Sequence, residues 1–226
     1  MAKCKYCGRG GLFLAVDKNG ICRDCAKFVY PQIKHYLTRV QGYFSAMQKT
    51  KHPKTIISKR DDILEVLNHL EDEFESKGIS VFDYSVSQMR RDMLSAADEL
   101  LIDLLAEEAK KTDSKAVVSD TPKQKATHYK RFLSKLVDFE SLMSDPSQIS
   151  AIKYDIIVKI REHIIQDLIT KAQKYEFKGY LKKAREIYMD ALFELKNDDI
   201  PDELQAHLIN IVQDNLNRLE AEIGEG

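Results

Sequence analysis

Two Cys-x-x-Cys pairs, Cys4-Lys-Tyr-Cys7 and Cys22-Arg-Asp-Cys25, constrain the fold most strongly, and they contain all four cysteines of the chain. Such a pair can direct two thiolates at one ion, and two pairs complete a tetrahedral site with Zn–S distances of ~2.3 Å. A redox motif or free core thiols are the alternative. The matched pairs, with no cysteine left over, favour one Zn²⁺ per chain. Four thiolates leave no open coordination position, so the predicted zinc is structural.

The residues around the pairs predict a small zinc module over residues 1–30. Gly8, Gly10 and Gly11 follow the first pair, where a knuckle needs close backbone approach. Residues 12–16 read as a short strand, and Asp17-Lys-Asn-Gly20 has the composition of a hairpin turn. The second pair leads into helical sequence.

This order of knuckle, hairpin and helix start resembles the treble-clef and zinc-ribbon families over about residues 4–30. The resemblance implies a module that binds DNA, RNA or protein, and it leaves the choice among them open.

Composition and charge set limits on the rest of the chain. The sequence has 226 residues, of which 43% are hydrophobic and 31% charged, as expected for a helical protein rich in charges. No apolar run approaches the ~20 residues that span a bilayer, and the amino terminus lacks the apolar region of a signal peptide. We therefore expect a cytoplasmic protein without a membrane partner, in a compartment where thiols stay reduced.

The charge is unevenly distributed along the chain. Residues 1–60 contain thirteen Lys and Arg against two Asp, whereas the remainder contains 22 basic and 34 acidic residues. Five basic residues lie close in sequence to the cysteines, and Tyr6 and Phe13 could stack on bases. A nucleic-acid site in this region would use Lys3, Lys5, Arg9, Arg23 and Lys27.

Apolar residues at three-and-four spacing predict a mainly α-helical body of about seven helices. The sequence divides it into a helical region over 31–111, a linker over 112–121 that lacks periodicity, and a second helical region over 122–226. The first four helices are expected at about 31–48, 54–76, 86–111 and 122–143, with Pro31 at the head of the first. The last helix is expected at about 202–222, as a cap with a polar outer face.

One stretch resembles a tetratricopeptide repeat over about residues 165–198. Small and large residues alternate around a central glycine, through Ala172, Tyr175, Gly179, Tyr180, Ala184, Tyr188 and Ala191. The resemblance implies a helical hairpin that binds a partner protein, with Ile169 and Gln173 on the face turned away from Ala172 and Tyr175. A helical hairpin without a binding groove is the alternative.

Catalytic motifs are missing from the sequence. It has no phosphate-binding loop, no dinucleotide fingerprint and no His-Glu-x-x-His, and its six histidines are scattered. We therefore expect a non-enzymatic adaptor that binds another protein through its helical body. The alternative is a nucleic-acid-binding regulator that uses the basic amino-terminal region.

Overall fold

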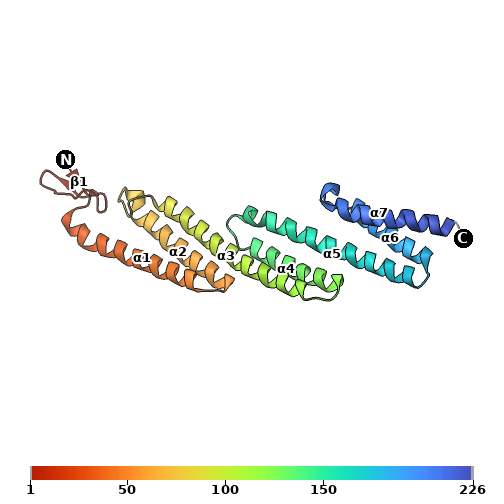
Figure 1. Cartoon of the computed structure of the whole chain (residues 1–226). Coiled ribbons are helices and arrows are strands. Elements are labelled where there is room, and N and C mark those ends of the chain that lie inside the picture. Colours follow the sequence, from red (N-terminus) through yellow and green to blue (C-terminus); the bar gives the residue numbers. More distant parts are fainter. Residues whose placement is uncertain (1, 225–226) are drawn as a thin grey trace. The chain divides into compact units, whose positions relative to one another are not determined.

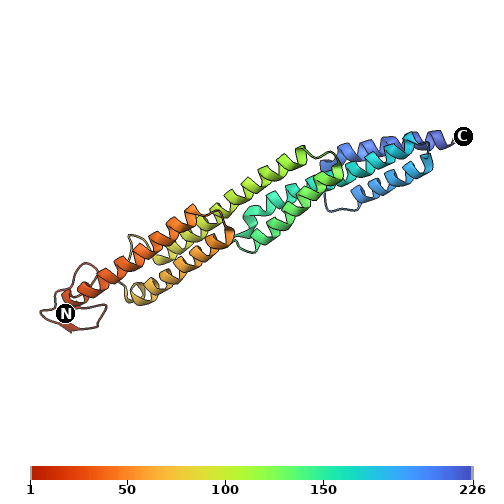
Figure 2. The ribbon, with the colours of Figure 1, turned by 90° about the horizontal axis from the view of Figure 1, so that it is seen from below.

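A computed structural model describes residues 2–224, and these residues confirm the mainly helical fold class (Figures 1 and 2). They form seven α-helices and one small antiparallel sheet. The elements are β1 (Ala2–Lys3), β2 (Gly10–Gly11), α1 (Arg23–Lys49), α2 (Pro53–Glu73), α3 (Val86–Val117), α4 (Pro122–Glu140), α5 (Ser150–Phe177), α6 (Leu181–Lys196) and α7 (Asp202–Gly224). A short 3₁₀ turn, η1 (Glu75–Lys77), follows α2, and a second, η2 (Pro146–Ile149), precedes α5.

The chain folds as two compact units. Unit 1 contains the residues up to Leu105 together with Ser141–Asp145, and unit 2 contains Ala106–Glu140 and the residues from Pro146 onward. Helix α3 therefore contributes to both units. No helix in the described part of the chain combines the length and hydrophobicity needed to cross a membrane.

The core of unit 1 lies between α1, α2 and the start of α3. Helix α1 contributes Val29, Ile33 and Val40, whose spacing places them on one face of the helix. Helix α2 contributes residues at the same kind of spacing, and Val86 of α3 joins them. The buried residues of α2 in this cluster are Ile63, Val66, Leu67 and Leu70.

The loop after α4 is tied to unit 1 by two side chains. The buried carboxylate of Asp98 accepts hydrogen bonds from the backbone N–H groups of Ser144 (3.0 Å) and Asp145 (2.9 Å). The Arg60 guanidinium donates to the carbonyl oxygen of Leu142 at 2.9 Å. These bonds explain why residues 141–145 belong to unit 1.

Helices α5, α6 and α7 share the core of unit 2. Ala172 of α5 and Ala184 of α6 are fully buried, as is the ring of Tyr188. The Tyr188 hydroxyl donates to Glu176 at 2.8 Å, so this buried ring keeps a partner for its polar end. Gly179 ends the α5 segment with a φ of +77°, a conformation that favours glycine. Helix α7 covers this core with Leu208, Val212, Leu216 and Leu219.

Two expectations about local structure near the amino terminus are wrong. Residues 12–16 form no strand, apart from an isolated bridge between Val16 and Cys22, because Leu12 and Phe13 occupy a tight turn. The sheet instead pairs β1 with β2, with Ala2 opposite Gly11. Helix α1 begins at Arg23, and Pro31 lies inside it. The helix continues through Pro31, although a proline at this position donates no backbone hydrogen bond.

The connection between α3 and α4 is shorter than predicted. Helix α3 continues to Val117, so residues 112–117, assigned to a linker, are helical. The hydroxyl of Tyr129 on α4 donates to Asp113 at 2.8 Å, and Ala116 is buried. The sequence of this stretch shows no helical periodicity, because a few contacts stabilise it and it has no long apolar stripe.

Candidate metal centre

The first cysteine pair lies on a tight knuckle after β1. The backbone N–H of Cys4 donates to the carbonyl of Arg9 at 2.8 Å, and the N–H of Gly8 donates to the carbonyl of Cys4 at 2.9 Å. Gly8 has a φ of +72°, which a residue with a side chain rarely adopts. The knuckle therefore needs the glycine that follows Cys7.

The second pair lies at the start of α1. Cys22 is the residue immediately before the helix, and Cys25 lies in its first turn. Asp17 shapes the preceding loop, because its Oδ1 accepts the backbone N–H groups of Asn19 (2.9 Å) and Ile21 (3.0 Å). The hydroxyl of Tyr30 on α1 also donates to the Asp17 carboxylate, which fixes this loop against the helix.

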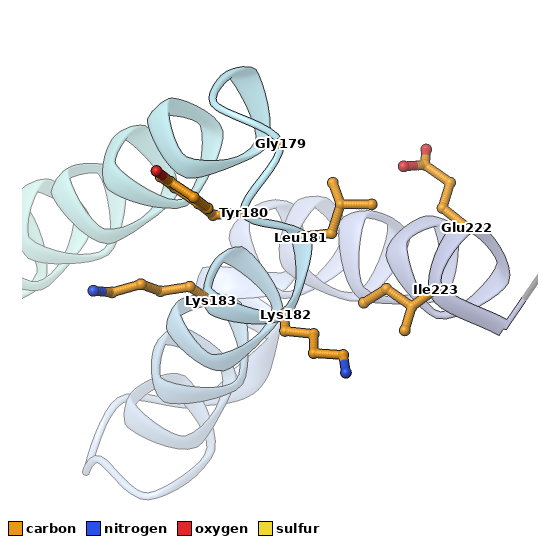
Figure 3. Close-up of a pocket in the computed structure, with 7 residues that line it drawn as sticks. All are labelled: Gly179, Tyr180, Leu181, Lys182, Lys183, Glu222 and Ile223. Atoms are coloured by element: carbon orange, nitrogen blue, oxygen red, sulfur yellow. The ribbon is translucent and has the colours of Figure 1, made fainter. Parts of the chain in front are cut away.

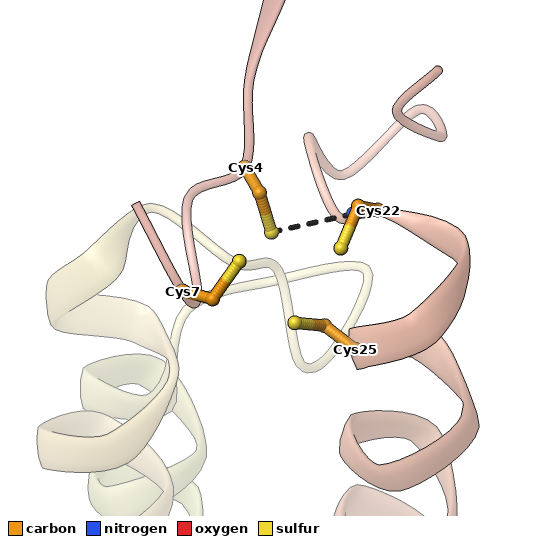
Figure 4. Close-up of side chains that lie close together, drawn as sticks. All are labelled: Cys4, Cys7, Cys22 and Cys25. Carbon is orange, nitrogen blue, oxygen red and sulfur yellow. Dashed lines mark hydrogen bonds between the residues drawn. The ribbon is translucent and has the colours of Figure 1, made fainter. Parts of the chain in front are cut away.

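The knuckle and the helix start bring the four sulfur atoms together (Figure 4). The Sγ atoms all lie within 4.8 Å of one another. A tetrahedral ion with metal–sulfur distances of ~2.3 Å needs its sulfurs ~3.8 Å apart, so a small adjustment of the side chains would complete such a site. The backbone N–H of Cys22 already donates to the Cys4 sulfur at 3.3 Å. The four cysteines can therefore hold one metal ion, as their spacing predicts.

The acidity of the thiols differs across this cluster. Burial raises the pKa of Cys4, but hydrogen bonds from the backbone N–H groups of Cys7, Cys22 and Tyr6 outweigh burial and lower it to about 6. Burial and the neighbouring sulfurs raise the pKa of Cys25 to about 12. One thiolate forms readily, and adding others beside it is opposed by charge repulsion. A bound cation would remove that opposition.

The metal centre packs directly on the end of α2. The ammonium group of Lys5 donates to the carbonyl of Gly78 at 2.6 Å. The ring of Tyr6 stacks on Phe74 with centroids 6.3 Å apart, and Lys77 lies 4.8 Å above the Tyr6 ring. Cys4 and Cys22 are themselves part of the buried cluster of unit 1. The cysteine module is thus joined to the helical core of this unit.

The basic residues proposed for nucleic acid differ in their surroundings. Lys5 is held by Gly78, and Lys27 lies 3.7 Å from Asp24. The side chains of the other three are exposed and form no ion pair among residues 2–224; they are Lys3, Arg9 and Arg23. The ring of Tyr6 already contacts Phe74 and Lys77 and is part-buried, so less of it is available to a base.

A turn beside β2 exposes two apolar side chains. The N–H of Leu14 donates to the carbonyl of Gly11 at 3.4 Å, which places Leu12 and Phe13 at the tip of a tight turn. Leu12 is 79% exposed and Phe13 is fully exposed. The sequence suggests a role in base stacking for Phe13 and none for Leu12, because both are expected in a strand.

The two helical residues proposed for partner binding do not share an outward face. Ile169 is buried in the core of unit 2, so its assignment to an exposed face is wrong. Gln173 is exposed. Ile169 turns inward because it lies three residues before Ala172, on the same face of α5.

Comparison with family models, with curated proteins and with solved structures gave no match. The functional conclusions therefore rest on the residues themselves.

Proposed function

We propose that this chain is a non-enzymatic adaptor that binds one structural Zn²⁺ through Cys4, Cys7, Cys22 and Cys25 and a partner protein through its helical body. The cluster of four sulfurs carries the proposal. Thiolates select soft or borderline metals, and four thiolates that can be arranged as a tetrahedron suit zinc. With four protein ligands, the zinc has no coordination position left for a substrate. The zinc stabilises the knuckle and the start of α1. A reducing cytoplasm would keep these thiols available to the metal.

Exposed aromatic residues support the partner-binding part of the proposal. In the helical body Phe177 is 94% exposed and Phe193 is 66% exposed, although side chains of this size are usually buried. Protein interfaces are enriched in such residues, because they remove a large apolar area from water when they are covered. The absence of a catalytic motif in the sequence is consistent with a binding role.

Nucleic-acid binding by the cysteine module is the second candidate function. It is supported by the exposed side chains of Lys3, Arg9 and Arg23 and by the free ring of Phe13. The engagement of Lys5 and Tyr6 within unit 1 reduces the surface available to it. We therefore favour the adaptor.

Metal analysis of the purified full chain tests the zinc site. We expect one zinc per chain, and loss of most of it in Cys22→Ser, because each thiolate contributes to a closed four-ligand site. Ala15→Ser, an exposed change in the same module, is the matched control and should keep the metal. Protein that contains no metal, or that holds these cysteines in disulfides, would contradict the proposal.

Salt-dependent binding of duplex DNA and of single-stranded RNA separates the two functions. Each phosphate contact should lower the logarithm of affinity by ~0.9 per tenfold rise in salt on duplex DNA. On the adaptor proposal, binding is weak at physiological salt. Tight, salt-steep binding that is abolished by Arg9→Glu together with Arg23→Glu, with zinc retained, would instead establish the second function.

A further inference from the structure

Outside the metal centre, the turn between α5 and α6 exposes two aromatic side chains. Phe177 at the end of α5 is 94% exposed, and Tyr180 just before α6 is 59% exposed. Neither ring belongs to the buried cluster between α5, α6 and α7, which contains Tyr188 and aliphatic residues. Exposed apolar groups that gather at one place on a surface are typical of interaction sites.

A pocket lies beside this turn, entirely within unit 2 (Figure 3). It has a volume of about 520 Å³, and Leu181 of α6 and Ile223 of α7 form its apolar walls. Polar side chains from Lys182, Lys183 and Glu222 surround them, and Tyr180 completes one side. Apolar walls with a polar rim can accept one apolar side chain of a bound molecule.

The charge around the pocket is strongly positive. Residues 171–183 contain five lysines and a single acidic residue, Glu176. Arg218 pairs with Glu176 and, at 3.0 Å, with Glu222, so each of these two carboxylates has a cationic partner. Across residues 2–224, by contrast, no ion pair involves three of the lysines, namely Lys174, Lys178 and Lys182.

We propose that this surface, consisting of Phe177, Lys178, Tyr180, Leu181, Lys182 and Ile223, binds an acidic segment of a partner protein that inserts one apolar side chain into the pocket. The inference rests on the proposed adaptor function and specifies the chemistry of the partner. The unpaired lysines complement carboxylates, which steers association and selects against basic partners. The exposed rings and the apolar walls supply the contact area that excludes water.

The same observations favour a peptide over the other polyanions. A nucleic acid is bound through several phosphate contacts, made by both lysine and arginine, so it needs a broad basic surface. Both arginines at this end of unit 2 are engaged internally, Arg185 with Glu220 at 2.9 Å and Arg218 with Glu176 and Glu222. An anionic bilayer would attract the lysines, but it presents no protruding side chain to fill the pocket.

Fluorescence anisotropy with the full chain and a labelled synthetic peptide tests the proposal. The peptide alternates aspartate and glutamate around one central phenylalanine. We expect Phe177→Ala and the pair Lys178→Glu with Lys182→Glu each to weaken binding about tenfold, as for a contact near the centre of an interface. The lysine pair should also reduce the salt dependence of binding. Lys130→Glu, an exposed lysine on α4, is the matched control and should bind like the unmodified chain.

Three results would overturn the proposal. The first is no binding of the peptide, or a loss in Lys130→Glu equal to that in the lysine pair. The second is equal binding of a peptide with alanine in place of its phenylalanine. The third is binding to single-stranded DNA or to phosphatidylserine vesicles that is tighter than to the peptide and depends on Phe177.

Zinc content measured on the same samples separates this inference from the adaptor proposal. If the chain contains zinc but does not bind the peptide, this inference is contradicted and the zinc site is not. A chain without zinc that binds the peptide through Phe177 contradicts the structural zinc site and supports the surface.

Discussion

Asp98 illustrates how one side chain can hold a loop that is distant in sequence. Asp98 is 1% exposed, and its carboxylate accepts hydrogen bonds from the backbone N–H groups of Ser144 and Asp145. Both residues lie in the connection between α4 and α5. The Asp98 carboxylate is buried whereas Ser144 and Asp145 are exposed, so these hydrogen bonds supply partners for a buried acceptor and fix the loop to it.

We predict that Asp98→Ala lowers the free energy of unfolding by about 1–3 kcal/mol, because the hydrogen bonds to a buried carboxylate are lost. Urea denaturation followed by circular dichroism measures the change. Asp103→Ala, an exposed residue on the same helix, is the control and should be close to neutral. A loss that is the same for both variants would show that the Asp98 bonds contribute nothing specific.

Single residues differ in how well the sequence predicts them. The four cysteines could be identified because chelation by a Cys-x-x-Cys pair depends on local spacing, and the fold brings the two pairs together. The sequence expectation for Ile169 was wrong, because a spacing of three residues places it on the same buried face of α5 as Ala172. The sequence favours Tyr6 as a residue available for stacking, because Phe74 and Lys77, which contact its ring, are far away in sequence.

At the scale of elements, an ion network joins α3 to α4 within unit 2. Glu108 of α3 pairs with Lys135 of α4 and, at 2.8 Å, with Lys111 one turn along its own helix. Hydrogen bonds from these two ammonium groups lower the pKa of Glu108 to about 2. The carboxylate is part-exposed, so solvent screening limits what the pairs add to stability.

The lowered pKa of Glu108 predicts a pH-dependent contribution to folding. The stabilisation is present above the unfolded pKa of ~4.3 and is lost as pH falls toward the folded value. Glu108→Gln should therefore cost up to about 1 kcal/mol at pH 6 and almost nothing near pH 2. Urea denaturation at both pH values measures this, with Asp190→Asn on α6 as the control. A cost that stays constant across this range would contradict the assignment.

The element boundaries show what helical periodicity predicts and what it leaves out. Apolar stripes located all seven helices, because each stripe covers a core. Helix α1 begins at Arg23, between Cys22 and Cys25, which carry no apolar period, and Pro31 inside the helix gave a misleading start. The extension of α3 to Val117 depends on polar contacts such as Tyr129 with Asp113, which no stripe reveals.

At the scale of the whole molecule, the cysteine module belongs to one of the two units. Cys4, Ile21 and Cys22 share a buried cluster with Phe74 and Ile79 at the end of α2. The core of unit 2 is a separate cluster, formed by α5, α6 and α7. A metal bound by the four cysteines should therefore stabilise unit 1 beyond the module itself, and leave unit 2 unaffected.

Hydrogen exchange measured by mass spectrometry, with and without a chelator, tests this division. A structural zinc contributes ~10–16 kcal/mol to small modules, comparable to the whole stability of a domain of ~5–15 kcal/mol. Removing it should expose the amides of residues 4–30 and also those around Phe74 and Ile79, because the packing of Tyr6 and Lys5 is lost with the knuckle. Amides of α6 and α7 should keep their protection.

Cys22→Ser should reproduce the pattern without the chelator. Exchange confined to residues 4–30 would show instead that the module folds independently of α2, and equal loss in α7 would show that the two units unfold as one.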